Sequence, residues 1–198
     1  MGLCSDTDEA LVAALGAPRT KGERRKLVIA DARPRKNALA NGAMGGGSEP
    51  RGHYLCSEVV YLGIDNIHAV RESAHKLREY LEQFGGPSVC LGQRRNGGNW
   101  GVGGSWGLST SAAAEALVST SWLQHVHKLL CGAAFVATQV CVEGSSVLVH
   151  CSDGWDRTPA VLCCALVMMD PHYRTRKGFK AMVELHWASF GHQVIKVS

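Results

Sequence analysis

Three short apolar runs have the length and composition of buried strands, and they lie far apart along the chain. They cover residues 27–30, 58–64 and 147–149, and valine and isoleucine are prominent in the first two runs. Apolar residues at helical spacing predict helices over 7–16, from 67 onwards, and over 122–140, 161–169 and 177–190. Strands that alternate with helices predict an α/β fold with a parallel-centred sheet flanked by helices.

The helical patterns also predict which residues are buried and where the helices begin. Asp6 or Thr7 is expected to cap the first helix, and Thr158 the helix that continues through 161–169, with Pro159 in its first turn. The inward face of the 122–140 helix is predicted to hold Leu123, Val126, Leu130, Ala133, Ala134 and Ala137. The buried stripe of the last helix is predicted to hold Phe179, Met182, Val183 and Trp187.

Residues 85–120 break the periodic pattern. This stretch is rich in glycine and serine, and we predict a Gly/Ser-rich insertion that forms a loop. The whole chain, with 198 residues of which 45% are hydrophobic, is long enough for one globular domain with a core. No apolar run reaches the roughly 20 residues that a membrane-spanning helix needs.

Charge and cysteine content narrow the class of protein. The net charge of +4 favours acidic surfaces without indicating nucleic acid. Eight cysteines occur without a C-x2-C pair, so the sequence predicts neither a disulfide framework nor a zinc site, and a reducing cytosol fits best. His125 and His127 are two residues apart on a predicted helix and point away from each other, so we expect no metal ion or other cofactor.

Candidate chemistry lies where the 147–149 strand meets the next helix. Cys151 follows the strand, and Arg157 follows six residues later, with five residues between them, beside the helix start, where unpaired N–H groups favour an anion. A thiolate surrounded by such donors can attack phosphorus, and a guanidinium can grip two phosphoryl oxygens. Asp153 and Asp156 are the carboxylic acids within reach of a leaving group.

The segment 150–158, His-Cys-Ser-Asp-Gly-Trp-Asp-Arg-Thr, resembles the signature of the myotubularin-related phosphoinositide phosphatases. Protein tyrosine and dual-specificity phosphatases share the C-x5-R frame, but the Ser-Asp-Gly-Trp-Asp filling is more specific. The resemblance implies that Cys151 is the nucleophile, Arg157 grips the phosphate and Asp156 is the general acid. It also implies that the backbone of Ser152, Asp153, Gly154 and Trp155 cradles the 3-phosphate.

Three further stretches carry the same resemblance: Asp-Ala-Arg-Pro at 31–34, Asn-Ile-His at 66–68 and Phe-Gly-His at 190–192. It implies that the side chains of Asn41 and Asn66 contact the inositol headgroup and that Ile67 adds a backbone contact. Two positions depart from the family. Gln193 and Val197 stand where basic residues grip a second headgroup phosphate, and Lys196 is the nearby basic residue. We therefore expect weaker binding of a bisphosphate.

The resemblance implies a cysteine-phosphatase-like, truncated catalytic domain over residues 1–198. Its expected reaction is hydrolysis of the 3-phosphate of phosphatidylinositol 3-phosphate through a phosphocysteine, with the 3,5-bisphosphate as a second candidate substrate. The chain is expected to be cytoplasmic, peripheral at endosomal-type membranes, and able to pair with like or other myotubularin-like chains. Two alternatives stay open: a weakly active fragment that acts as a scaffold or partner, and a protein tyrosine or dual-specificity phosphatase.

Overall fold

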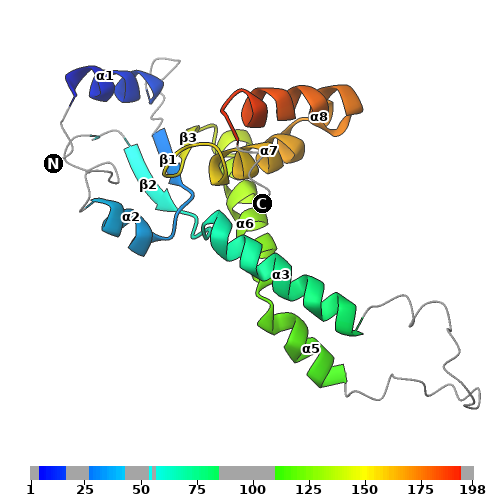
Figure 1. Cartoon of the computed structure of the whole chain (residues 1–198). Coiled ribbons are helices and arrows are strands. Elements are labelled where there is room, and N and C mark those ends of the chain that lie inside the picture. Colours follow the sequence, from blue (N-terminus) through cyan, green and yellow to red (C-terminus); the bar gives the residue numbers. More distant parts are fainter. Residues whose placement is uncertain (1–4, 17–26, 43–53, 55–56, 85–109, 193–198) are drawn as a thin grey trace, which may run out of the picture. The chain divides into compact units, whose positions relative to one another are not determined.

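A computed structural model describes residues 5–16, 27–42, 54, 57–84 and 110–192. The chain divides into two compact units. The first comprises Met1–Asn66 and His127–Ser198, and the second comprises Ile67–Val126. Figure 1 shows the elements with their labels. Among the described residues, no helix has the combination of length and apolar content that crossing a bilayer requires.

The first unit is built on a three-stranded parallel sheet in the order β2-β1-β3. The strands are β1 (Leu27–Asp31), β2 (Ser57–Tyr61) and β3 (Ser146–His150), so the three predicted strands are confirmed. All five residues of β1, the middle strand, are buried. The register pairs Asp31 with His150, which brings the carboxyl ends of β1 and β3 side by side. This confirms the predicted α/β fold with a parallel sheet.

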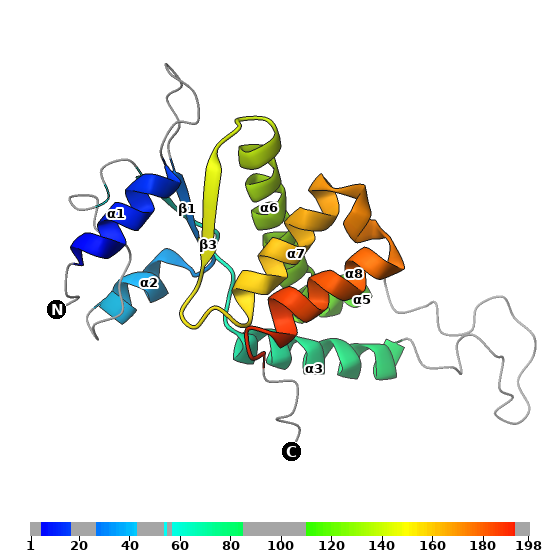
Figure 2. The same ribbon diagram turned by 90° about the horizontal axis from the view of Figure 1, so that it is seen from above.

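Helices cover both faces of this sheet. Figures 1 and 2 show α1 (Asp6–Leu15) and α2 (Arg35–Gly42) on one side, and α7 (Arg157–Met169) with the main part of α6 (Trp122–Cys141) on the other. The core between the sheet and α6 and α7 contains mostly small and branched residues: Ala30, Ala32, Ile64, Ala133, Val136, Cys151, Val161 and Ala165. Cys151 is therefore part of the core as well as the first residue after β3.

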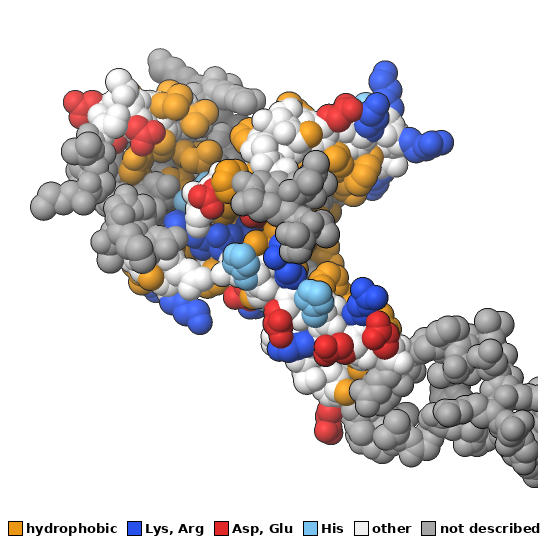
Figure 3. Space-filling view, viewed as in Figure 1, with side chains coloured by type: hydrophobic (Ala, Val, Ile, Leu, Met, Phe, Trp, Pro, Cys, Tyr) orange, Lys and Arg blue, Asp and Glu red, His pale blue; other side chains and the backbone are white. Residues whose placement is uncertain are grey.

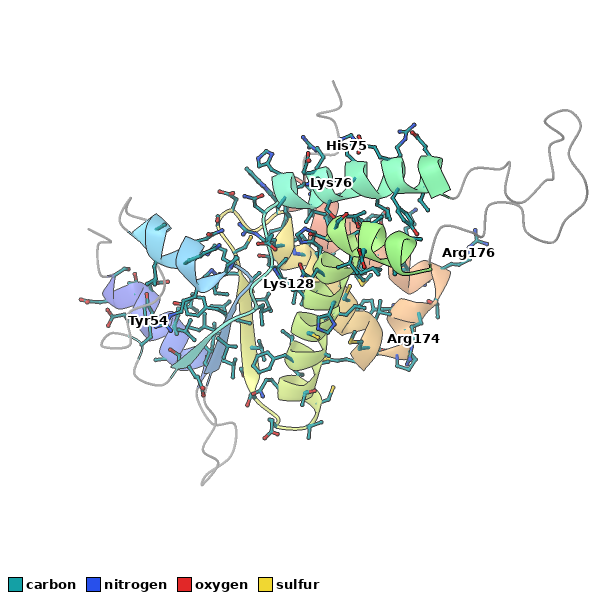
Figure 4. The ribbon with its side chains drawn as sticks, turned by 90° about the horizontal axis from the view of Figure 1, so that it is seen from below. Tyr54, His75, Lys76, Lys128, Arg174 and Arg176 are labelled. Atoms are coloured by element: carbon teal, nitrogen blue, oxygen red, sulfur yellow. The ribbon has the colours of Figure 1, made fainter. Side chains whose placement is uncertain are left out.

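Both predicted helix caps are wrong by one or two residues. Ser5 caps α1, and its hydroxyl accepts a hydrogen bond from the N–H of Asp8. Asp8 also accepts a 2.6 Å hydrogen bond from the hydroxyl of Tyr54, which is labelled beside α1 in Figure 4. Asp156, not Thr158, occupies the cap position of α7. The first turn of α7 thus starts at Arg157 and includes Thr158.

The predicted inward face of α6 is correct only in part. Leu123 and Leu130 are 56% and 45% exposed, and Ala134 is also exposed. The buried residues are Gly132, Ala133 and Val136. A Cβ at Gly132 would lie 3.2 Å from Cδ1 of Leu62, so small residues on this face allow α6 to approach the segment after β2 closely.

The predicted helix over 177–190 is divided. A 3-10 helix, η1 (Pro171–Arg174), leads into α8 (Arg176–Val183), and a π-helical turn, η2 (Glu184–Ala188), follows it. Met182 is buried as predicted, but Phe179 and Val183 are 54% and 37% exposed, so that part of the stripe is wrong. Arg174 and Arg176, labelled in Figure 4, are also exposed.

The second unit contains α3 (Ile67–Phe84) and α5 (Thr110–Ser119), which contact each other, and the first residues of α6. Figure 3 shows acidic and basic side chains mixed along α3, and two i,i+4 ion pairs, Glu72 with Lys76 and Arg78 with Glu82, lie there. Residues 85–109 of the predicted insertion lie outside the described residues. The loop prediction is wrong for 110–119, because Thr-Ser-Ala-Ala-Ala-Glu-Ala-Leu-Val-Ser forms a helix.

Candidate active site

The candidate site is the six-residue loop between β3 and α7. Cys151 follows β3 directly and is 8% exposed, and Arg157 is the first residue of α7. Gly154 has a φ of +85°, a conformation that side-chain-bearing residues rarely adopt. This turn directs the N–H of Gly154 back to the Cys151 sulfur, at an N to Sγ distance of 3.3 Å. The loop therefore curls around the sulfur.

The surroundings of Cys151 favour the thiolate. Burial by itself raises the pKa of this thiol, but hydrogen bonds from Thr158 and from backbone N–H groups outweigh it, and the pKa of Cys151 is lowered. The backbone donors belong to Gly154, Thr158 and Asp153. The buried Thr158 hydroxyl has no partner of full hydrogen-bond geometry among the described residues, and it lies close enough to the sulfur to stabilise a negative charge there.

The cysteines of α7 provide a contrast. Burial raises the pKa of Cys163 and of Cys164, which have no comparable set of donors. Cys163 is buried and Cys164 is half-buried against the core, which fits their prediction as small core residues. Of these three cysteines, Cys151 is the one whose surroundings favour the thiolate, which is the nucleophilic form.

Arg157 closes the loop from its other end. Its Nη2 donates a 3.1 Å hydrogen bond to the hydroxyl of Ser152, so the residue after the cysteine and the first residue of the helix are linked. The α7 amides and the positive end of its 13-residue dipole start at the same point. A phosphoryl group next to the sulfur would thus meet a guanidinium, amide donors and a helix N-terminus.

Asp156 occupies the cap position of α7, but its side chain makes no capping hydrogen bond, although aspartate is a preferred capping residue. It has no side-chain hydrogen bond to the described amides of α7. Its Oδ1 lies 2.9 Å from Nδ1 of His192, and the same nitrogen lies 2.9 Å from the carbonyl oxygen of Trp155. The sequence prediction missed His192, although it lies in the Phe-Gly-His stretch that contributed to the resemblance.

A buried ion pair lies beside His150, the residue that precedes the loop. Asp31 ends β1, and Arg33 follows it. The Nε and Nη2 atoms of Arg33 donate to the two carboxylate oxygens of Asp31 at 2.9 and 2.7 Å, and both side chains are nearly inaccessible. His150 lies beside this pair, with Nε2 4.0 Å from Asp31 Oδ2, and its Nδ1 donates to the carbonyl of Cys151 at 3.1 Å. The Asp-Ala-Arg-Pro stretch contributed to the resemblance, but the sequence analysis did not predict this ion pair.

The other predicted site residues differ in their exposure and in the unit of the chain to which they belong. Ser152 and Asp153 are exposed on the loop, and Gly154 and Trp155 are half-buried in it. Asn66 is exposed at the end of the first unit, and Ile67, 38% exposed, begins α3 in the second unit. The side chain of Asn41, and Gln193, Lys196 and Val197, lie outside the described residues. The described residues contain no cluster of three His, Cys, Asp or Glu side chains that could hold a metal ion.

The model for the myotubularin-like phosphatase domain matches residues 2–196. Phosphatidylinositol-3-phosphatase myotubularin-1 of Arabidopsis thaliana is 53% identical over 97% of this chain, and phosphatidylinositol-3,5-bisphosphate 3-phosphatase MTMR4 of Homo sapiens is 42% identical over 96%. Myotubularin of Xenopus tropicalis is 42% identical over 88%. The chain covers 23%, 14% and 25% of the lengths of these relatives. The match along nearly the whole chain, together with the loop around Cys151, shows that the chain belongs to the myotubularin-like phosphatase family.

Proposed function

We propose that this chain carries the catalytic centre of a cysteine-dependent phosphatase that removes the 3-phosphate from phosphatidylinositol 3-phosphate. The observation that carries the proposal is the environment of Cys151. Its sulfur lies 3.3 Å from the nitrogen of Gly154, its pKa is lowered, and the loop that surrounds it leads into Arg157 at the start of α7. The name of the Arabidopsis thaliana relative, a phosphatidylinositol-3-phosphatase, supports the substrate. The name of the human relative supports the 3,5-bisphosphate as a second substrate.

In the first step, the Cys151 thiolate attacks phosphorus. An S–P bond forms while the bond from phosphorus to the inositol 3-oxygen breaks, and protonated Asp156 gives its proton to that leaving oxygen. Arg157 binds two phosphoryl oxygens in a planar fork and offsets the charge that develops on them. The loop amides and the N-terminus of α7 add donors to the same group. The products are phosphatidylinositol and a phosphocysteine.

In the second step, water replaces the sulfur. The Asp156 carboxylate accepts a proton from the water as it attacks phosphorus, and the S–P bond breaks. Inorganic phosphate leaves and the thiolate is restored. The lowered pKa of Cys151 serves this step as well, because a more acidic thiol is a better leaving group. Apart from the attacking water, the reaction as proposed uses side chains and amides of this chain.

The proposed place of reaction is the cytoplasmic surface of endosomal-type membranes, where a phosphoinositide headgroup is exposed to a peripheral protein. The net charge of +4 favours approach to acidic lipid headgroups. Other myotubularin-like chains are the proposed protein partners. The proposed membrane location depends on the substrate class, and the proposed partners depend on membership of the family.

The test measures phosphate release from short-chain phosphatidylinositol 3-phosphate by the 198-residue chain. Cys151→Ser is expected to reduce release to background. Cys141→Ser, which alters an exposed thiol of α6, is the matched control and should retain the full rate. Equal rates for Cys151→Ser and the unaltered chain would refute the proposed chemistry. Faster release from a phosphotyrosine peptide than from the lipid would refute the substrate and favour a protein phosphatase.

A further inference from the structure

We infer that His192 is a positioning residue for the phosphatase reaction: it holds the carboxyl group of Asp156 and the backbone of the loop in their working arrangement. This inference rests on the proposed function, because it assigns a role within that reaction. His192 lies 41 residues after Cys151 in the sequence, well past the end of the strand–loop–helix motif that contains the nucleophile.

The geometry identifies which nitrogen of the His192 ring carries the hydrogen. Nδ1 lies 2.9 Å from the Trp155 carbonyl oxygen, and a carbonyl oxygen can only accept a hydrogen bond. Nδ1 therefore carries the proton and donates it. Asp156 Oδ1, at 2.9 Å from the same nitrogen, shares this donor. His192 and Asp156 are both largely shielded from solvent, with side chains 21% and 27% exposed. One N–H group thus fixes two consecutive residues of the loop.

A specific helix ending places His192 there. The π-helical turn η2 is closed by a 3.0 Å hydrogen bond from Ser189 N–H to the Glu184 carbonyl, and the His192 N–H donates to the Trp187 carbonyl at 3.1 Å. Gly191, with φ of +76°, then reverses the chain, which is the usual role of glycine after a helix. π-Helical turns are rare and occur frequently at functional sites.

Trp187 supports the His192 ring. The two rings meet edge to face with centroids 4.6 Å apart, and the Trp187 side chain also hydrogen-bonds to Cys163 of α7. The His192 ring is therefore held by α7 through Trp187 and by the loop through Nδ1. These two contacts leave the ring little freedom to rotate.

His192 determines which groups the Asp156 side chain contacts. An aspartate at a helix cap position normally accepts hydrogen bonds from the first amides of the helix. Those amides are needed here for the phosphoryl group, so an Asp156 carboxyl group bound to them would compete with it for the same donors. His192 engages Oδ1 and so draws the carboxyl group away from the helix amides. Oδ2 is then left to carry the proton that the leaving oxygen takes.

Two substitutions separate the hydrogen bond from the ring contact. His192→Phe keeps an aromatic ring against Trp187 and removes the donor. His192→Asn loses the ring but keeps an N–H donor near the position of Nδ1. We expect kcat on the lipid to fall on the order of 10- to 100-fold in His192→Phe with little change in KM, and to recover largely in His192→Asn. His172→Phe is the matched control, because His172 makes a similar edge-to-face contact with Tyr173 outside the site.

A leaving-group comparison tells positioning from a general loss of structure. An aryl phosphate such as p-nitrophenyl phosphate has a leaving oxygen that needs little protonation, so His192→Phe should lose much less activity on it than on the lipid. Equal losses on both substrates, or no recovery in His192→Asn, would overturn the inference. If the unaltered chain shows no release that depends on Cys151, the proposed function fails instead.

A second measurement needs no turnover. Nitrogen-15 NMR of the unaltered chain should show the His192 ring with its proton on Nδ1, because hydrogen-bond partners determine which ring nitrogen is protonated. Asp156→Ala should perturb this signal, whereas the His172 signal should not change. A proton on Nε2 alone would overturn the inference whatever the activity.

Discussion

At the scale of single residues, the chemistry depends on a balance around one sulfur atom. Burial raises the pKa of Cys151, and the Thr158 hydroxyl is the first of four hydrogen-bond donors that together reverse this effect. The two effects oppose each other, so the loss of one donor should be visible in the reactivity of the thiol. Among these donors, the Thr158 hydroxyl can be removed by a substitution that leaves the backbone in place.

Thr158→Val removes the hydroxyl and keeps the branched shape of the side chain. We expect the pKa of Cys151 to rise, because a donor to the thiolate is lost while the burial remains. The measurement is the pH dependence of Cys151 alkylation by iodoacetamide, whose rising limb should move to higher pH. Cys131 and Cys141, both exposed, serve as internal references. A limb that stays in place or moves to lower pH would contradict the assigned role of Thr158.

The ion pair of Asp31 and Arg33 also acts at residue scale, but on stability. Both side chains are almost fully buried, with exposures of 0% and 4%. Asp31→Asn or Arg33→Met leaves the partner charge buried without its counter-ion, which costs roughly 3–5 kcal/mol. We expect the double variant to be less destabilised than the sum of the two single variants, because no unpaired charge remains.

Urea unfolding measures these free energies, with Glu82→Gln as the matched control. Glu82 pairs with Arg78 at 2.9 Å on the solvent-exposed side of α3, where such a pair contributes about 0.3–0.5 kcal/mol. If Arg33→Met destabilised the chain no more than Glu82→Gln, the Asp31–Arg33 ion pair would have no importance for stability.

At the scale of elements, the junction of η1 and α8 depends on Gly178. A Cβ at this position would lie 2.7 Å from the carbonyl carbon of His172 and would meet its oxygen as well. Helix propensity alone predicts that Gly178→Ala stabilises α8 by about 1 kcal/mol. We expect the opposite sign, a loss of about 1–3 kcal/mol, because backbone atoms must move to make room.

The check is the melting temperature of Gly178→Ala beside that of Gly132→Ala. The added Cβ at Gly132 meets the end of the flexible Leu62 side chain at 3.2 Å, and that side chain can move. The Gly178 variant should therefore melt at the lower temperature. A Gly178 variant that melts at or above the unaltered chain would show that the close approach to His172 does not constrain this junction.

The strands were predictable from the sequence and the buried helix faces were not. The runs at 27–30, 58–64 and 147–149 are short and apolar, with few alternatives to a buried strand, and β1 is buried at every position. In α6, apolar residues surround the helix, so periodicity admits several faces. The face that packs contains Gly132 and Ala133, because small residues let the helix approach the neighbouring segment, while the larger Leu123 and Leu130 are exposed.

Two other errors at this scale have different causes. Glycine and serine dominated the composition of 85–120 and concealed the alanine-rich helix at 110–119. The last helix reads as continuous over 177–190, because a π-helical turn has no pattern of its own in the sequence. Yet this turn is the feature that brings His192 to the loop, which is why the sequence prediction included Cys151, Asp156 and Arg157 and missed His192.

At the scale of the whole molecule, the candidate site joins three parts of the chain that lie far apart in sequence. The end of β1 supplies Asp31 and Arg33, the loop supplies residues 151–156, and the segment after η2 supplies His192. The parallel register that pairs Asp31 with His150 brings the first two together. A contiguous motif could be recognised without the fold, whereas the supporting residues required the sheet order and the helix ending.

The central claim is that a phosphoryl group passes through the Cys151 sulfur. The most direct measurement mixes the chain with short-chain phosphatidylinositol 3-phosphate that carries a radioactive 3-phosphate, stops the reaction with denaturant within a turnover, and maps the label by peptide digestion. The account predicts label on the peptide that contains Cys151, and none in Cys151→Ser. Release of labelled phosphate without any labelled peptide, or continued release by Cys151→Ser, would contradict it.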